Sequence, residues 1–119
     1  MGKAIVLFGH GSRDPLWRLP METVAARLRA LQPDTPVRCA YLELDEPDLP
    51  TAASDLVAAG ADRVTVVPMF LGTGRHARED LPALVRALEQ VHPTVTFVLQ
   101  QPVGQDVRVL DLIAKIALE

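Results

Sequence analysis

The sequence is poor in cysteine and in aromatic residues, and it contains no long hydrophobic run. Its single cysteine, Cys39, excludes an internal disulfide, which is typical of proteins from a reducing compartment. Phe, Trp and Tyr together make up 4% of the residues, so the core must be built from aliphatic side chains. No run approaches the roughly 20 apolar residues that cross a membrane, and the first residues lack the pattern of a signal peptide. We therefore expect a cytoplasmic protein with no membrane partner.

The chain also lacks an excess of basic residues. Its formal net charge is −3, so no general positive field attracts nucleic acid, and basic residues would have to gather locally to bind an anionic ligand. Hydrophobic residues make up 49% of the 119 positions, which argues against a disordered chain. This length is near the usual size of one domain, and there is no linker or repeat. We expect a single domain over residues 1–119.

Four short runs of β-type residues alternate with four helical patterns along the chain. The first and third runs are almost continuously apolar, as in parallel strands whose two faces are both covered. Alternation at this spacing predicts right-handed crossovers between parallel strands. We therefore expect an α/β fold of three layers, with a four-stranded parallel sheet flanked by helices in a Rossmann-like or flavodoxin-like topology. The expected strands are residues 3–9, 36–43, 63–71 and 94–100.

The helical patterns are apolar stripes with intervals of three and four residues. Asp48 suits the N-cap of the second helix and Gly60 its C-terminal stop, while Glu79 and Asp80 suit the positive start of the third. Pro68, inside the third strand run, predicts an irregularity near the end of that strand. The last stripe is wide enough to contact both the sheet and a second subunit. The stripes are Met21, Val24, Leu28 and Leu31; Leu49, Ala52, Ala53, Leu56 and Val57; Leu81, Leu84, Val85, Leu88 and Val91; and Val109, Leu110, Leu112, Ile113, Ile116 and Ala117.

Polar residues gather where the predicted strands end. Ligand sites of open parallel sheets lie beyond the carboxyl ends of the strands, so we expect His10 and His76 at one edge of the sheet. His92 precedes the fourth strand, at the opposite edge, and we expect it to be structural. Three arginines lie on the histidine edge of an otherwise acidic chain. The polar residues after the four strands are Gly9 to Arg13; Glu43, Asp45 and Glu46; Gly72, Gly74, Arg75, His76 and Arg78; and Gln100 and Gln101.

His10 stands between two glycines. Gly9 and Gly11 allow a sharp turn and a close approach to a ligand, so His10 can project into a cleft. Neutral imidazoles bind divalent transition metals and accept protons near neutral pH. Glu43 could complete a metal site or relay a proton. The ligand spacing of a closed structural zinc site is absent. Two histidines on one edge therefore predict a metal or acid–base site.

Three segments together resemble a known family. GHGSRDP (9–15), YLELDEPDLPTA (41–52) and VVPMFLGTGRHAREDLP (66–82) are similar, in order and spacing, to the small sirohydrochlorin chelatases of the class II chelatase superfamily. The resemblance covers essentially the whole chain. It implies a lyase that inserts Co²⁺, Fe²⁺ or Ni²⁺ into sirohydrochlorin, on the routes to cobalamin, sirohaem or coenzyme F430. The metal is then a substrate, and no nucleotide or organic cofactor is needed, which agrees with the absence of a phosphate-loop motif.

The resemblance also implies roles for individual residues. His10 is the proton acceptor and a metal ligand, His76 is the second metal ligand, and Glu43 lies in the path of metal and protons. Short members of the family are usually homodimers, and one four-stranded domain offers only half of a deep cleft. The chain lacks the histidine-rich stretch that some relatives carry. The expected substrate contacts are Ser12, Arg13, Glu46, Leu71, Gly72, Thr73, Gly74 and Arg75, with Met69, Phe70 and Leu71 beside an apolar cleft.

Two other functions stay open on the sequence. The first is a hydrolase or phosphatase that uses His10 as nucleophile or a metal centre with two histidines, although Ser12 lacks the flanking pattern of a nucleophile elbow. The second is a carrier that binds metal or tetrapyrrole in the same cleft without catalysis. The physiological metal also stays open, because imidazole and carboxylate ligands accept Fe²⁺, Co²⁺ and Ni²⁺ with affinities ordered mainly by the metal.

Overall fold

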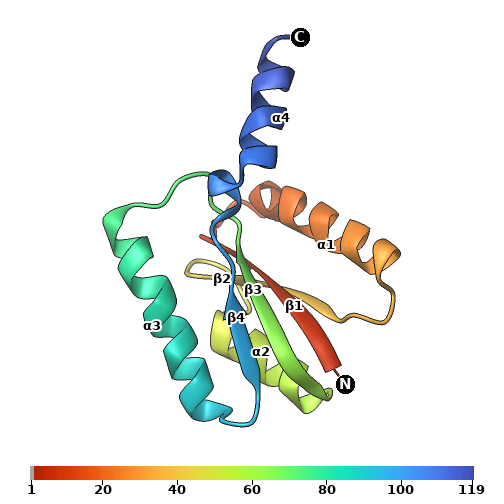
Figure 1. The fold of residues 1–119 in the computed structure, drawn as a ribbon, viewed down its shortest axis with the longest axis vertical. Helices are drawn as coiled ribbons and strands as arrows, with labels where there is room; N and C mark the ends of the chain where they lie inside the picture. The colour runs from red at the N-terminus through yellow and green to blue at the C-terminus, as the bar shows by residue number, and fades with distance from the viewer. Residues whose placement is uncertain (1) are drawn as a thin grey trace.

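Strands and helices alternate along the chain as predicted, and all four strands are parallel (Figure 1). The computed structural model describes residues 2–119, except for the side chain of His76. The order of strands in the sheet is β2-β1-β3-β4, so β1 and β3 occupy its centre. The expected α/β fold is therefore confirmed. The elements are β1 (Gly2–Gly9), η1 (Pro15–Arg18), α1 (Leu19–Leu31), β2 (Val37–Tyr41), α2 (Leu49–Ala58), β3 (Ala61–Pro68), α3 (Arg75–Val91), β4 (Thr96–Leu99), η2 (Val103–Gln105) and α4 (Val107–Ala117).

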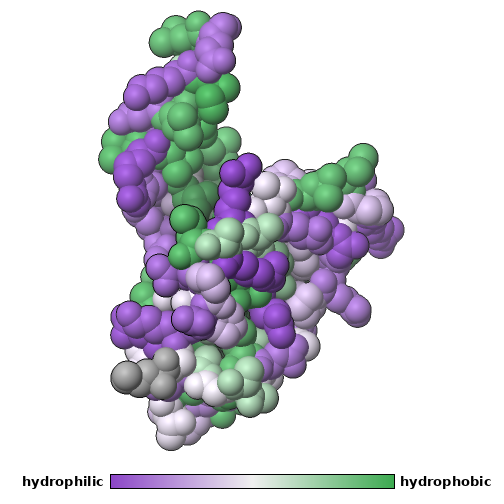
Figure 2. All heavy atoms as spheres, turned by 90° about the vertical axis from the view of Figure 1, so that its right-hand side faces the viewer, coloured by the Kyte–Doolittle hydropathy of each residue, from purple (hydrophilic) through white to green (hydrophobic). Residues whose placement is uncertain are grey.

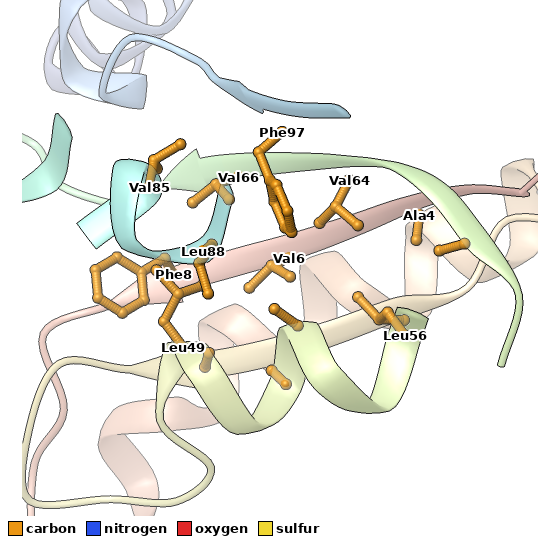
Figure 3. Close-up of a cluster of buried hydrophobic side chains, with 14 of the residues drawn as sticks. Ala4, Val6, Phe8, Leu49, Leu56, Val64, Val66, Val85, Leu88 and Phe97 are labelled. Carbon is orange, nitrogen blue, oxygen red and sulfur yellow. The ribbon is translucent and has the colours of Figure 1, made fainter. Parts of the chain in front are cut away.

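One face of the sheet is covered by α2 and α3. Alternate residues of β1, namely Ala4, Val6 and Phe8, point to this face and are at most 1% exposed. Figure 3 shows them next to Leu49 and Leu56 of α2, with Val85 and Leu88 of α3 in the same cluster. Burial of an aliphatic side chain of this size stabilises a fold by about 1.5–3 kcal/mol. This cluster is the larger of the two hydrophobic cores.

The opposite face is covered by α1, over β1 and β2. The side chains of Leu7, Val37 and Tyr41 are buried there against Met21 and Ala25 of α1. The period of two in a strand sends Leu7 to this face while its neighbours in β1 point to the other. Helices on both faces of the sheet are thus confirmed.

Two expectations about the ends of helices are wrong. Leu31 and Val91, expected within apolar stripes, are 74% and 68% exposed, because each is the last residue of its helix. Glu79 and Asp80 lie in the second turn of α3 and not in its first, because Gly74 is extended and the helix already begins after it.

Three other local predictions agree with the structure. The carboxylate of Asp48 caps α2 by accepting a hydrogen bond from the N–H of Thr51 at 2.9 Å. Gly60 ends the turn after α2 with φ +107°, a conformation that side-chain-bearing residues rarely adopt. The irregularity predicted at Pro68 is the end of β3, of which it is the last residue, so the expected end of this strand at position 71 is wrong.

The helix α3 contains a proline in its interior. Pro82 has no N–H group, so the carbonyl of Arg78 lacks the hydrogen bond that it would otherwise accept inside the helix. Leu81, Val85 and Leu88 are buried against the sheet on both sides of this position. Packing against the sheet therefore holds the helix in place where its own hydrogen bonding is interrupted.

The C-terminal helix α4 does not cover the sheet. It extends away from the carboxyl edge (Figure 1), none of its residues is buried, and hydrophobic side chains line its surface (Figure 2). The expected contact of its stripe with the sheet is therefore wrong. The reason lies in η2: the N–H of Gly104 donates to the carbonyl of Phe70 at 2.9 Å, and a Cβ at Gly104 would overlap the carbonyl oxygen of Leu71. Asp106 then caps α4 directly, so the helix leaves at once in a fixed direction.

No helix among residues 2–119 is both long enough and apolar enough to cross a membrane.

Candidate active site

The connections from the two central strands, β1 and β3, run to opposite sides of the sheet. From β1 the chain passes through α1, on one face, to β2; from β3 it passes through α3, on the other face, to β4. The segments after β1 and β3 therefore diverge to opposite faces and leave a crevice between them. Crevices of this kind, at the carboxyl edge of an open parallel sheet, are where such folds bind ligands. The expected site segments lie at this edge.

His10 is exposed directly after β1, next to an aromatic ring. Its imidazole contacts Phe70 edge to face, with ring centroids 5.7 Å apart and planes at 71°. Phe70, on the segment after β3, also contacts Phe8 of the core in this way. The core thus orients Phe70, and Phe70 orients the imidazole. The contact between His10 and Phe70 was not predicted, because it depends on how two loops distant in sequence meet.

The imidazole of His10 helps to line a cavity of about 100 Å³. The segment after β2 contributes Leu42, the first half of α3 contributes a second wall, and Phe8 and Phe70 complete the lining. Apart from His10 and one aspartate, the lining is apolar, so the expected apolar cleft is present in reduced size. Of the residues expected beside it, Phe70 lines the cavity, Met69 packs under α1 on the other face, and Leu71 is 68% exposed. The lining residues are Phe8, His10, Leu42, Phe70, Ala77, Asp80, Leu81 and Leu84.

The backbone of His10 is tied to the segment after β2. The N–H of Leu42 donates to the carbonyl of Gly9 at 2.9 Å, and that of Glu43 donates to the carbonyl of His10 at 3.1 Å. Gly11 has φ +99°, and a Cβ there would overlap the carbonyl oxygen of Glu43. The need for glycine at position 11 is confirmed, but the close neighbour in this structure is the Glu43 backbone.

Glu43 lines a different cavity from His10. This cavity, of about 440 Å³, is acidic, since Glu43, Asp45, Glu46 and Asp48 all line it. Asp45 forms an ion pair with Arg18, with Nη1 and Oδ1 3.2 Å apart. No hydrogen bond joins the carboxylate of Glu43 to the imidazole of His10, so the two share a backbone contact and not a side-chain contact.

Tyr41 closes the acidic cavity on its inner side. Burial, together with the charges of the nearby Cys39 and Asp45, raises the pKa of Tyr41 to about 12. The phenol is therefore neutral across the physiological range of pH. Its ring contacts Trp17 edge to face, with centroids 6.2 Å apart.

The segment from Leu71 to Gly74 is exposed or half-buried, and nothing lies within 4 Å of a Cβ placed on Gly72 or Gly74. It can therefore face a ligand. Arg75 pairs with Glu79, with Nε and Oε1 3.4 Å apart, on the exposed side of α3. His76 is the second residue of this helix, but its side chain lies outside the described part of the structure. Its neighbour Ala77 lines the cavity of His10.

The remaining residues of the expected site lie around this edge. The hydroxyl of Ser12 accepts a hydrogen bond from the N–H of Asp14 at 3.1 Å and so stabilises the turn before η1. Arg13 is exposed, and Glu46 is exposed in the wall of the acidic cavity. His92 ends α3 at the opposite edge, with its Nε2 3.5 Å from the hydroxyl of Ser54.

Among the described side chains, no group of three His, Cys, Asp or Glu residues is arranged to hold a metal ion. The predicted metal site pairs His10 with His76, and the second imidazole is outside the described part. The ligand pair therefore stays a prediction.

A family model described as CbiX matches residues 4–119. The chain belongs to the CbiX family. Its sequence is 28% identical over 135 residues to the sirohydrochlorin cobaltochelatase of Methanocaldococcus jannaschii, with 93% of this chain and 94% of the relative covered. It is 35% identical over 82 residues to that of Methanopyrus kandleri, with 69% of this chain and 57% of the relative covered.

Solved structures of CbiX and SirB proteins share this fold. The CbiX protein from Marinobacter aquaeolei VT8 is 36% identical, with a TM-score of 0.83 over 97% of this chain and 93% of that one. The sirohydrochlorin chelatase SirB from Bacillus subtilis, in complex with cobalt, is 28% identical with a TM-score of 0.82. This chain covers only 49% of SirB, so SirB is about twice as long.

Proposed function

We propose that this chain is a sirohydrochlorin chelatase, a lyase that inserts Co²⁺, Fe²⁺ or Ni²⁺ into the macrocycle in the biosynthesis of cobalamin or sirohaem. The observation that carries the proposal is the exposed imidazole of His10 in the lining of an apolar cavity, where the connections from β1 and β3 diverge to opposite sides of the sheet. The cobaltochelatase relatives and the cobalt and Fe³⁺ complexes of SirB support it. The cobaltochelatase relatives and the single cysteine of the chain support the cytoplasm as its place of action.

In the proposed reaction the metal replaces two pyrrole protons of the macrocycle. His10 and His76 hold the ion by one nitrogen each and leave positions open for the incoming pyrrole nitrogens. As the metal moves to the macrocycle, the freed imidazole of His10 accepts the two protons one after the other and passes each to water, and the exposure of the ring permits these transfers. The edge contact with Phe70 keeps the ring facing the macrocycle during both steps.

In this proposal Glu43 acts without a hydrogen bond to the imidazole of His10. Glu43 lines the acidic cavity, where Glu46 and Asp48 add negative charge. Such a cavity attracts divalent cations and protons, and it adjoins the His10 loop through the backbone of Glu43. We therefore assign to Glu43 the passage of metal and protons towards His10, and to Glu46, Ser12, Arg13 and residues 71–75 contacts with the rim of the macrocycle.

Substitution of the three histidines tests the proposal. His10→Ala and His76→Ala should each lower the rate of Co²⁺ insertion by at least about 100-fold, the lower end of what one acid–base group contributes. His92→Ala, at the other edge, should retain most of the activity. Insertion is followed by the change in the absorption spectrum of sirohydrochlorin, and folding by circular dichroism. Equal losses in all three variants would contradict the assignment, because they would indicate a general loss of stability.

The number of turnovers separates the proposal from its alternatives. An enzyme metallates many macrocycles per chain, whereas a carrier changes the spectrum only up to the stoichiometric amount. A hydrolase with two metal-binding histidines would leave the spectrum unchanged and cleave a chromogenic phosphate ester. With excess sirohydrochlorin and Co²⁺ we expect multiple turnovers and no ester hydrolysis.

We also propose that the chain acts as a homodimer. The cavity beside His10 is about 100 Å³, whereas pockets for drug-sized ligands measure about 300–1,000 Å³, so one copy cannot enclose a macrocycle. An isolated helix as short as α4 is only marginally stable in water, yet Leu110, Leu112, Ile113 and Ile116 are all at least 43% exposed. Two copies would match the length of SirB. A second copy that covers α4 accounts for all three observations.

Light scattering on two variants with the same change of net charge tests the dimer. Ile116→Lys places a charge in the apolar surface of α4 and should yield monomers with little activity. Asp111→Asn, on the polar side of the same helix, should remain dimeric. A wild-type chain that is monomeric and fully active would contradict the proposal.

A further inference from the structure

A second cavity lies at the same edge of the sheet, on the β4 side of α3. Its volume is about 350 Å³, more than three times that of the cavity beside His10. Leu81 lines both cavities, so they are neighbours beneath the first half of α3. Of its polar residues, only Thr73 is among the expected substrate contacts, and the proposed mechanism uses none of the others. The polar residues are Thr73, Arg78, Gln100, Gln101 and Gln105.

The polar lining of this cavity is suited to an anion. It contains one guanidinium and three primary amides, and no acidic side chain. The cavity around Glu43 has the opposite character, with four carboxylates in its lining. A guanidinium and amide N–H groups can donate several hydrogen bonds to one carboxylate, and such charge-assisted bonds are about twice as strong as neutral ones.

Arg78 forms no ion pair with a described side chain, in contrast to two other arginines at this edge. Arg75 is paired with Glu79, and Arg18 is paired with Asp45 and Glu22. The guanidinium of Arg78 donates one hydrogen bond to the carbonyl of Thr73 at 3.3 Å, and within residues 2–119 it has no carboxylate partner. That bond directs the side chain back over the segment that follows β3, and its other N–H groups are available to a ligand.

We propose that Arg78, with the amides of Gln100 and Gln101, binds one peripheral carboxylate of the macrocyclic substrate. This inference rests on the proposed function, in which the centre of the macrocycle faces His10. Sirohydrochlorin is apolar at its centre and ringed with carboxylates, so a macrocycle over the small cavity brings a side chain to the neighbouring one. Arg78 is then a binding and positioning residue, which fixes the rotation of the macrocycle about His10.

Steady-state kinetics on Arg78→Gln test this assignment. Loss of a charge-assisted bond at an exposed site should raise the KM for sirohydrochlorin about tenfold, with a small change in kcat and none in the KM for Co²⁺. Arg86→Gln is the matched control, because Arg86 is an exposed residue of the same helix outside both cavities and the change of charge is the same. Arg78→Lys should recover part of the affinity.

A binding measurement without metal keeps this inference separate from the proposed function. Titration of metal-free sirohydrochlorin with the protein, followed by its fluorescence, should give a Kd about tenfold higher for Arg78→Gln than for wild type. Gln101→Leu should weaken binding in the same direction, with the thermal midpoint checked for each variant. If Arg78→Gln and Arg86→Gln behave alike, or if kcat falls while KM and Kd stay unchanged, the inference is wrong even if wild type inserts metal. A wild type that binds sirohydrochlorin through Arg78 without turnover would contradict the proposed function alone.

Discussion

The replacement of Gly11 by alanine tests how firmly the fold fixes His10. Gly11 has φ +99°, and this left-handed region costs a residue with a side chain roughly 1–2 kcal/mol. The added Cβ also overlaps the carbonyl oxygen of Glu43, so the two loops must separate. Separation weakens the 3.1 Å hydrogen bond from the N–H of Glu43 to the carbonyl of His10, a bond that contributes about 0.5–1.5 kcal/mol. Together these terms predict a loss of about 1.5–3.5 kcal/mol in the free energy of unfolding.

Gly60→Ala is the matched control for this variant. Gly60 has a similar φ of +107°, but nothing lies within 4 Å of its added Cβ, and it stands at the opposite edge of the sheet. It should therefore lose only the roughly 1–2 kcal/mol of the backbone term. With a urea m-value of about 2 kcal/mol/M, the unfolding midpoint should fall by roughly 0.8–1.8 M in Gly11→Ala and by roughly 0.5–1 M in Gly60→Ala.

Activity should separate the two variants more sharply than stability. Displacement of a catalytic group by about 1 Å can lower a rate by about 100-fold, so Gly11→Ala should lose most of its insertion activity while Gly60→Ala retains it. Unfolding is measured by circular dichroism in urea, and insertion by the absorption spectrum under conditions in which both variants are folded. Equal midpoints and equal activities in the two variants would refute the argument from the contact with Glu43.

Three further predictions concern stability. Burial raises the pKa of Tyr41 to about 12, so the absorbance change of its phenol at 295 nm should occur near pH 12. The stabilisation of the fold that comes from the neutral phenol is complete below about pH 10 and is lost towards pH 12. Tyr41→Phe should remove this loss of stability. Asp48→Ala should lower the free energy of unfolding by about 1 kcal/mol at pH 7. The hydrogen bonds from Thr51 lower the pKa of the Asp48 carboxyl, so the difference in stability between variant and wild type should shrink only below about pH 4. Gly104→Ala should cost about 1–3 kcal/mol in urea unfolding, since its Cβ overlaps the carbonyl of Leu71.

The fold could be predicted because its signals are local and agree with one another. The continuous apolar run of β1 requires cover on both faces, and Asp48 and Gly60 mark the two ends of α2. Strand ends, read in order, place His10 and residue 76 at one edge of the sheet. These inferences need only the period of each element and the chemistry of its ends.

The rest depends on contacts between distant segments, which one sequence does not specify. The apolar stripe of α4 indicates that this face of the helix is covered, but it does not identify the partner. The sheet of the same chain does not cover it. The contact of His10 with Phe70 and the close approach of Gly11 to Glu43 each depend on the exact course of two loops. The separation of Glu43 from His10 into different cavities could not be predicted for the same reason.

Pro82 within α3 makes the α3 wall of the cavity beside His10 easier to deform than the wall formed by β1. His10 extends the hydrogen-bonded ladder between β1 and β2, whereas residue 76 and Arg78 belong to the two helical turns before Pro82, where one bond to the rest of the helix is missing. We expect amide hydrogens of residues 79–81 to exchange faster than those of residues 85–88. A bulky, planar ligand would then enter the cavity by a tilt of those two helical turns, while β1 and His10 keep their position.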